Sequence, residues 1–133
     1  MLRSVLYFSN SLLNCSKDAA IADLVQKSRN WNLSMGITGA LVCTVRNFVQ
    51  FIEGPDAAIA DLLGKIRADR RHARVNVLED TRAEDRHFHG WSLAYSGPDA
   101  YIDYDLVPLM QHGEQCPELA VALRTRLHAM ANA

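Results

Sequence analysis

Runs of β-favouring residues and two segments with apolar residues at helical spacing predict an α+β fold for this chain. The runs and helical segments follow one another in the order β-α-β-β-α-β-β. This order matches the split βαβ arrangement of ferredoxin-like folds with one added strand. We therefore expect a five-stranded mixed sheet with both crossover helices on one face. With 133 residues and 49% hydrophobic composition, the chain is long enough for one domain with a core and too short for two.

The first half of the chain predicts a strand, a helix and a hairpin. Arg3 to Ser9 is rich in β-favouring residues, and Ser16 is a candidate N-cap for the helix that follows. Ile37 to Val45 has the pattern of a buried strand, and Arg46-Asn47 makes a short turn into the strand Phe48 to Glu53. One stripe of the first helix carries Ile21, Leu24, Val25 and Ser28.

The second half predicts a helix and two further strands. Asp56 is a candidate cap for the second helix, and Glu53 just before it has the position of a turn residue. Val75 to Leu78 and Trp91 to Tyr95 supply the fourth and fifth strands, with a charged loop from Thr81 to His89 between them. The apolar face of the second helix carries Ile59, Leu62, Leu63 and Ile66.

The C-terminal segment from Pro117 to Met130 can form an amphipathic helix. Because both crossover helices lie on one face of the sheet, the other face needs a cover, and we expect C-terminal helices to supply it or to bind a partner. The sequence therefore divides into a domain of residues 1–96 and a C-terminal helical capping extension of residues 97–133.

Charge and cysteine content exclude several classes of protein. The formal net charge is −1, which gives no field to attract nucleic acid or an anionic membrane. The three cysteines, Cys15, Cys43 and Cys116, are widely spaced and form no CxxC pair, so we expect reduced thiols rather than disulfides. No apolar stretch has the length of a membrane span. We expect a soluble, cytoplasmic protein.

Familiar catalytic and metal-binding motifs are absent from the sequence. It contains no GxSxG, HExxH, P-loop or GxGxxG pattern. His87 and His89 flank Phe88, yet no third ligand stands at a suitable spacing for a metal. We therefore expect neither a metal site nor an enzyme.

Several polar residues could carry chemistry or could be purely structural. Gln50 shares one strand face with Phe48 and Ile52, and a buried amide there needs hydrogen-bond partners. Tyr7 lies in the first strand, and Asn32 follows the first helix in the position of a C-cap or turn residue. A last group ends the second helix, where cations are favoured even without a ligand. It consists of Lys65, Asp69, Arg71 and His72.

Taken together, these residues form a pattern that resembles the BLUF family of flavin-binding blue-light sensors, in its short stand-alone type. The pattern comprises L-Y-x-S from Leu6 to Ser9, N-x5-T-G from Asn32 to Gly39, F-x-Q-x-x-E-G-P from Phe48 to Pro55, D-x-R-H from Asp69 to His72, and W-S at Trp91-Ser92. The resemblance covers roughly residues 2 to 96, and the joint order of the motifs is far more specific than any one of them.

The resemblance implies non-covalent binding of FAD between the two helices and the sheet. Tyr7 matches the photoactive tyrosine, Gln50 the glutamine that joins it to the flavin, and Asn32 the amide at the polar edge of the ring. The flavin, once excited, would draw an electron and a proton from Tyr7, and Gln50 would relay the change by inverting its hydrogen bonds. The remaining matches to cofactor-binding positions are Leu24, Ser28, Lys65, Ile66, Asp69, Arg71 and His72.

The resemblance also places signal transmission at Trp91, Ser92 and Leu93, and implies a homo-oligomer that acts on a separate partner protein. Two positions depart from the family pattern. Leu93 stands where relatives often have Met, and Trp31 stands where they often have a second Asn.

Two other readings remain open from the residues alone. The chain could be a regulatory module of the same fold that binds a small ligand without flavin photochemistry. It could also be an acyl-phosphate hydrolase on the same scaffold, but that activity needs an Arg in the loop after the first strand, and Asn10 to Ser16 contains none.

Overall fold

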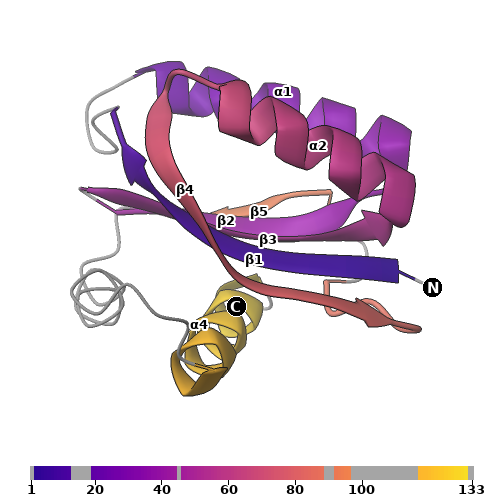
Figure 1. The fold of residues 1–133 in the computed structure, drawn as a ribbon. Helices are drawn as coiled ribbons and strands as arrows, with labels where there is room; N and C mark the ends of the chain where they lie inside the picture. Colours follow the sequence, from indigo (N-terminus) through magenta and orange to yellow (C-terminus); the bar gives the residue numbers. More distant parts are fainter. Residues whose placement is uncertain (1, 13–18, 45, 89–91, 97–116, 132–133) are drawn as a thin grey trace.

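A computed structural model describes residues 2–12, 19–44, 46–88, 92–96 and 117–131. It contains an open sheet with helices on both faces (Figure 1). The elements, in chain order, are β1 Leu2–Ser11, α1 Ala19–Met35, β2 Thr38–Cys43, β3 Asn47–Pro55, α2 Asp56–Ala68, β4 His72–Ala83, β5 Ala94–Ser96 and α4 Pro117–Ala131. The α+β class predicted from the sequence is confirmed.

The strands are ordered β4-β1-β3-β2-β5 across the sheet. The first four pair antiparallel throughout, and β5 adds three residues in parallel to β2. In the β1–β3 register, Tyr7 lies directly opposite Gln50. Cross-strand neighbours of this kind have their side chains on the same face and within contact distance.

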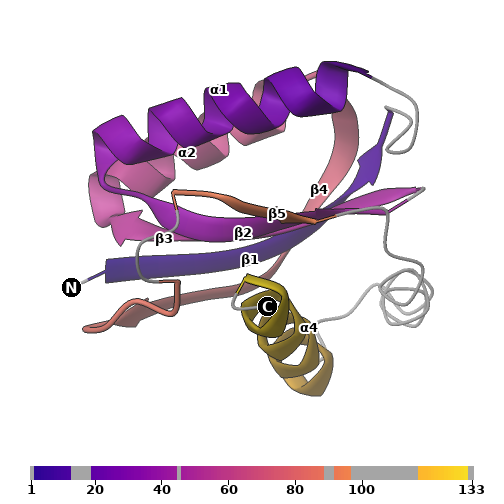
Figure 2. The ribbon, with the colours of Figure 1, turned by 180° about the vertical axis from the view of Figure 1, so that it is seen from behind.

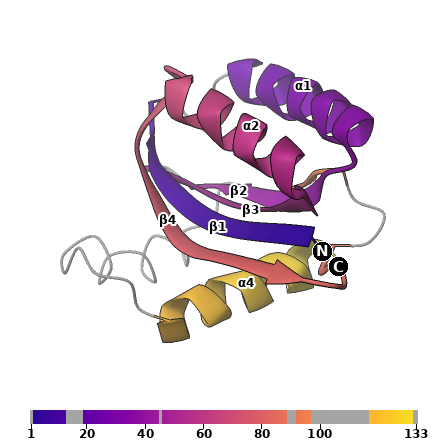
Figure 3. The same cartoon turned by 45° about the vertical axis from the view of Figure 1, so that its right-hand side comes forward.

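The two crossover helices lie on one face of the sheet and α4 lies on the other (Figures 2 and 3). Alternation along β1 separates these layers, because successive side chains of a strand point to opposite faces. Val5 packs with Ile52 and Ile59 under α2, whereas Leu6 belongs to the cluster that faces α4.

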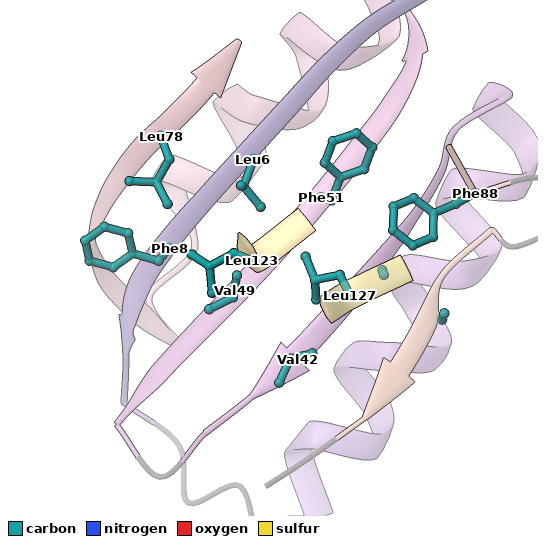
Figure 4. Close-up of a cluster of buried hydrophobic side chains, with 11 residues drawn as sticks. Leu6, Phe8, Val42, Val49, Phe51, Leu78, Phe88, Leu123 and Leu127 are labelled. Atoms are coloured by element: carbon teal, nitrogen blue, oxygen red, sulfur yellow. The ribbon is translucent and has the colours of Figure 1, made fainter. Parts of the chain in front are cut away.

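A cluster of buried hydrophobic side chains holds α4 on the sheet. Leu123 and Leu127 are both fully buried and lie among side chains of β1 and β3, including Leu6 and Phe51 (Figure 4). Arg124 forms an ion pair with Glu79 of β4 beside this cluster. The expectation that a C-terminal helix covers the second face is therefore confirmed for Pro117–Ala131.

The fourth strand is much longer than expected. It runs from His72 to Ala83 and pairs with β1 over most of its length, so the prediction of a loop from Thr81 was wrong. The full length of the strand was not predicted because many of its residues are charged. At the edge of the sheet such side chains remain in solvent while the backbone pairs with β1. Asp80, for example, accepts hydrogen bonds from the guanidinium of Arg3 at 3.0 and 2.7 Å.

The sequence also misplaced the start of α2 and the role of Glu53. Pro55 occupies the N-cap position without a side-chain cap bond, and Asp56 is the first helical residue and accepts from Arg82 at 2.9 Å. Glu53 is not a turn residue, as the sequence had suggested. It is fully buried within β3, and its carboxylate accepts hydrogen bonds from the backbone N–H groups of His87 and Phe88 at 2.8 and 2.6 Å.

Candidate functional site

A cavity of about 280 Å³ lies between α1, α2 and the helix-covered face of the sheet. Every residue that the resemblance to the BLUF pattern matched to cofactor binding lines it. These residues are Tyr7, Leu24, Ser28, Asn32, Gln50, Lys65, Ile66, Asp69, Arg71 and His72. Among the described residues, the lining also includes Lys27, Trp31, Leu41, Phe48 and Leu62. Side chains from four separate sequence motifs thus meet around one space.

Tyr7 and Gln50 form a buried pair at the floor of this cavity. The phenol of Tyr7 donates a hydrogen bond to Oε1 of Gln50. Tyr7 is 3% exposed and Gln50 is 7% exposed. Burial raises the pKa of Tyr7 well above its usual range, and the negative charge of Asp69 raises it further. Tyr7 is therefore a neutral phenol near neutral pH, with its proton already directed at an acceptor.

Asn32 lies in the last part of α1 rather than in the turn beyond it, which corrects the sequence prediction. Its backbone carbonyl accepts from the N–H of Ile37, so the backbone performs the role expected of a C-cap. The Asn32 side chain is buried, and its Nδ2 donates to the carbonyl of Ser92 at 2.7 Å. Its Oδ1 is buried and has no hydrogen-bond partner among the residues that the structure describes.

Trp31, next to Asn32, also contributes an unsatisfied polar atom. Its Nε1 is buried and lacks a hydrogen-bond partner within the described part of the chain. The ammonium of Lys65, from α2, lies 3.2 Å from the centroid of the Trp31 ring. This cation–π contact joins the two helices beside the cavity. The sequence did not predict the contact, because it depends on how α1 and α2 pack.

Asp69 and Arg71 form a compact ion pair where α2 leads into β4. The carboxylate of Asp69 accepts two side-chain bonds from Arg71 Nε, at 3.0 and 3.2 Å, and one from Nη2 at 2.7 Å. Its Oδ1 also accepts from the backbone N–H of Arg71. The side-chain hydrogen bond from Arg71 is the main reason that the pKa of Asp69 lies below its usual range.

His72 connects three elements beside the cavity. Its Nδ1 lies 2.6 Å from Oγ of Ser9 in β1, and its Nε2 lies 2.5 Å from the carbonyl oxygen of Ile66 in α2. Because a carbonyl can only accept, Nε2 carries a proton. Both ring nitrogens are thus engaged within the protein, and the ring packs edgewise near Tyr7 and Phe48.

The signalling positions that the resemblance implies lie partly within the described structure. Ser92 accepts the bond from Asn32, and the carbonyl of Leu93 accepts from Nε of Arg29 at 2.9 Å. Leu93 is 1% exposed and packs with Leu41 and Phe48. Trp91 lies outside the described residues. Arg29, which the sequence analysis missed, thus makes a second contact between α1 and this segment.

The described ranges contain no group of three or more His, Cys, Asp or Glu side chains that could hold a metal ion. None of the described helices is long and apolar enough to cross a membrane. Cys43 is buried, and its Sγ donates a hydrogen bond to the carbonyl of Thr44 at 3.3 Å, while Cys15, Cys116 and His89 fall outside the described residues.

A family model described as BLUF, sensors of blue-light using FAD, matches residues 2–94. The chain belongs to the BLUF family. The solved dark-state structure of BlrB, a BLUF protein, is 32% identical, covers 96% of both chains and has a TM-score of 0.77. Klebsiella pneumoniae BlrP1 with FMN and cyclic diGMP is 30% identical with a TM-score of 0.66, covering 72% of this chain and 26% of that one.

The curated relatives that the chain matches are much longer proteins. The photoactivated adenylate cyclase subunit alpha of Euglena gracilis is 32% identical over 104 residues, which cover 77% of this chain and 10% of the relative. Subunit beta from Euglena longa is 31% identical over 104 residues, with 12% of that protein covered. The chain thus spans about a tenth of the length of the curated relatives that it matches.

The lining of the cavity fits the flavin that a BLUF domain uses. Leu24, Leu41 and Ile66 provide apolar walls for a flat aromatic ring system. Asn32 Oδ1 is a buried acceptor without a partner in the described structure, and a flavin carries a matching N–H on its polar edge. Gln50 has two N–H donors besides the Oε1 that Tyr7 uses.

Proposed function

We propose that this chain is a blue-light receptor that binds FAD non-covalently in the α1–α2 cavity and detects light through Tyr7 and Gln50. The observation that carries this proposal is the buried hydrogen bond from Tyr7 to Gln50 at the floor of that cavity in a BLUF chain. In this proposal the remaining lining residues form the walls around the flavin ring or contact the ribityl and phosphate tail of FAD.

The residue chemistry supports a light-driven rearrangement without any acid–base apparatus. When bound, a flavin supplies an excited state that oxidises a nearby phenol. Tyr7 is buried and neutral, so it can release an electron together with the proton that it already directs at Gln50. The carboxamide of Gln50 combines an acceptor with two donors, so a rotation or a tautomer change inverts its hydrogen bonds without burying a net charge.

We assign FAD rather than FMN because the family description names FAD. Cationic side chains at the cavity, including Lys65 and Arg71, suit the phosphate groups of either flavin, so the family description alone carries this choice. The assignment is tested by releasing the bound flavin with acid and separating it by chromatography. Recovery of FMN from protein expressed with both flavins available would overturn it.

The decisive experiment for photoreception is a visible spectrum of the purified protein before and after blue light. We expect flavin bands that shift slightly to the red and return in darkness, because the hydrogen bonds to the ring change. Tyr7→Phe should retain flavin and lose the shift, since only the hydroxyl is removed. Gln50→Leu should behave alike. A full reversible shift in a flavin-loaded Gln50→Leu protein would refute the role of Gln50.

Protein that stays colourless when supplied with FAD would instead favour the ligand-binding regulatory module without photochemistry. Flavin binding with a reversible shift would exclude it.

We further propose that the signal leaves through Ser92, Leu93 and the neighbouring Trp91. The bonds from Asn32 and Arg29 to the carbonyls of Ser92 and Leu93 support this route, because they join α1 to the two residues that precede β5. In this proposal residues 1–96 form the sensor and residues 97–133 a capping extension. The output is a change of homo-oligomer or of binding to a separate cytoplasmic partner protein, and the chain itself performs no catalysis.

A further inference from the structure

The cavity wall carries a second side chain that can lose an electron. Trp31, in α1, lines the cavity together with Tyr7. An indole gives up one electron without first losing a proton, and electron transfer across a ligand site needs no direct contact. An excited flavin in this cavity would therefore have two electron donors beside it, the phenol of Tyr7 and the indole of Trp31.

The two donors differ in where their protons can go. The hydroxyl of Tyr7 already donates to Oε1 of Gln50, so a proton can follow the electron out of the phenol. The Nε1 of Trp31 is buried and has no acceptor in the described part of the chain. An oxidised Trp31 therefore keeps its proton and holds a positive charge on the ring. The electron would return to it without any change in hydrogen bonding, and the absorbed light would produce no signal.

A positive charge lies where the charge on an oxidised Trp31 would develop. The Nζ of Lys65, from α2, is 3.2 Å from the centroid of the indole ring. An ammonium at this position attracts the neutral ring and repels its radical cation, so the loss of an electron becomes less favourable. Two like charges about 4 Å apart oppose such a step by about fivefold in fully hydrated surroundings and by about a thousandfold near a protein surface. Lys65 is exposed, which places the effect toward the lower of these values.

Building on the proposed FAD site, we propose that Lys65 prevents Trp31 from reducing the excited flavin and so directs electron donation to Tyr7. In the suppressed step, one electron leaves the indole for the flavin, no bond forms or breaks, and the same electron later returns. In the step that remains, one electron leaves Tyr7 for the flavin while the phenol proton passes to Oε1 of Gln50. Lys65 acts through its charge on Trp31 and needs no contact with the flavin.

The test compares flavin-loaded wild type with Lys65→Met, which keeps an unbranched side chain and removes the charge. We expect Lys65→Met to shorten the fluorescence lifetime of the flavin and to add the transient absorption of an indole radical cation. It should also form less of the red-shifted state per absorbed photon, a yield that counts only protein holding flavin and is therefore independent of affinity. Two donors with equal rates would lower this yield about twofold.

Three further variants separate the charge from the shape of the site. Trp31→Phe in the Lys65→Met background should restore the wild-type yield, because a phenyl ring is much harder to oxidise than an indole. Lys65→Arg should keep the wild-type yield, since a guanidinium also binds to the face of an indole. Arg67→Met is the matched control, because Arg67 is an exposed cation of the same helix and is not among the residues that line the cavity.

A measurement without photochemistry checks the contact itself. Ultraviolet resonance Raman bands of an indole respond to a cation on the ring face. The difference between wild type and Lys65→Met therefore reports whether Lys65 still lies on Trp31 when flavin is bound. We expect this difference in flavin-loaded protein, and none between wild type and Arg67→Met.

The possible outcomes are distinguishable. A lower yield in Lys65→Met that Trp31→Phe restores supports the inference. An unchanged yield and lifetime in Lys65→Met, a lower yield that Trp31→Phe does not restore, or the lack of a Raman difference in flavin-loaded protein overturns the inference and leaves the proposed function intact. A wild-type protein that binds no flavin, or binds it without a reversible shift, overturns the proposed function and the role of Lys65 with it.

Discussion

Replacing Glu53 by Gln should destabilise the protein strongly, although the substitution only exchanges one carboxylate oxygen for an NH₂ group. The Glu53 carboxylate is fully buried. Its Oε1 accepts from Thr38 Oγ1 at 3.2 Å and from Phe88 N at 2.6 Å, and its Oε2 accepts from His87 N at 2.8 Å. A carboxylate suits this site because all three of its partners are donors. Gln must present its NH₂ group to one of the two backbone N–H groups.

The size of the effect follows from these three bonds. A hydrogen bond to a charged group contributes roughly 1.5–3 kcal/mol, and a buried donor left unsatisfied costs a similar amount. Glu53→Gln loses one such bond and weakens the other two, while the neutral amide recovers part of the desolvation cost of the carboxylate. The expected loss is about 3 kcal/mol in the free energy of unfolding. For a chain of this length, that loss lowers Tm by about 10 °C.

Urea unfolding followed by circular dichroism measures the loss, and Glu84→Gln is the matched control. Glu84 is an exposed glutamate just before the same segment, so its substitution should change stability by less than about 0.5 kcal/mol. Hydrogen exchange should also accelerate at His87 and Phe88 in Glu53→Gln. Equal stability of the two variants and unchanged exchange would show that the carboxylate does not hold this segment.

Three further comparisons test the fold and the buried phenol. Gly39→Ala should disrupt β2–β3 pairing, because its Cβ would lie 2.1 Å from the Phe51 carbonyl oxygen. Gly64→Ala should instead stabilise α2 by roughly 0.5–1 kcal/mol in urea unfolding, since a Cβ there meets no atom of the described structure within 4 Å. Leu123→Ala should cost roughly 2–5 kcal/mol, and Val121→Ala, at a position 48% exposed, should cost almost nothing in the same assay. The pKa of Tyr7 is raised in the folded protein, so the stability that the buried neutral phenol contributes is fully present below about pH 10, where the phenol of the unfolded chain is also neutral. That contribution falls as the pH rises from there toward the folded-state pKa. Wild type should therefore lose urea resistance relative to Tyr7→Phe above about pH 10. An equal loss in both proteins would contradict this assignment.

Most of the correct prediction about the sheet face under the helices came from the alternation of side chains between the two faces of a strand. It placed Gln50 on one face with Phe48 and Ile52, and the structure confirms that grouping beside α1 and α2. The pattern succeeded because β3 is a central strand with one face under the helices and the other under α4. The fourth strand was predicted only over Val75 to Leu78, and its remaining residues were missed for the opposite reason. At the sheet edge, backbone pairing with β1 decides the conformation, and side-chain polarity carries little information.

Contacts between elements far apart in the chain were beyond what the sequence could predict. The Lys65–Trp31 contact and the bond from Arg29 to Leu93 depend on the relative placement of elements far apart in the chain. Glu53 was misread for a related reason. Its partners, the N–H groups of His87 and Phe88, lie more than thirty residues away in sequence, and only the fold brings them together.

The cavity lining combines groups that the protein already satisfies with groups that it does not. Arg71 is paired with Asp69, and His72 uses both ring nitrogens within the protein, so a phosphate tail would have to compete for them. Asn32 Oδ1 has no such partner in the described chain. A ligand gains most where it satisfies buried polar atoms, and least where it must displace an existing, partly exposed ion pair. Recognition should therefore depend more on the polar edge of the ring, at α1, than on the tail near the end of α2.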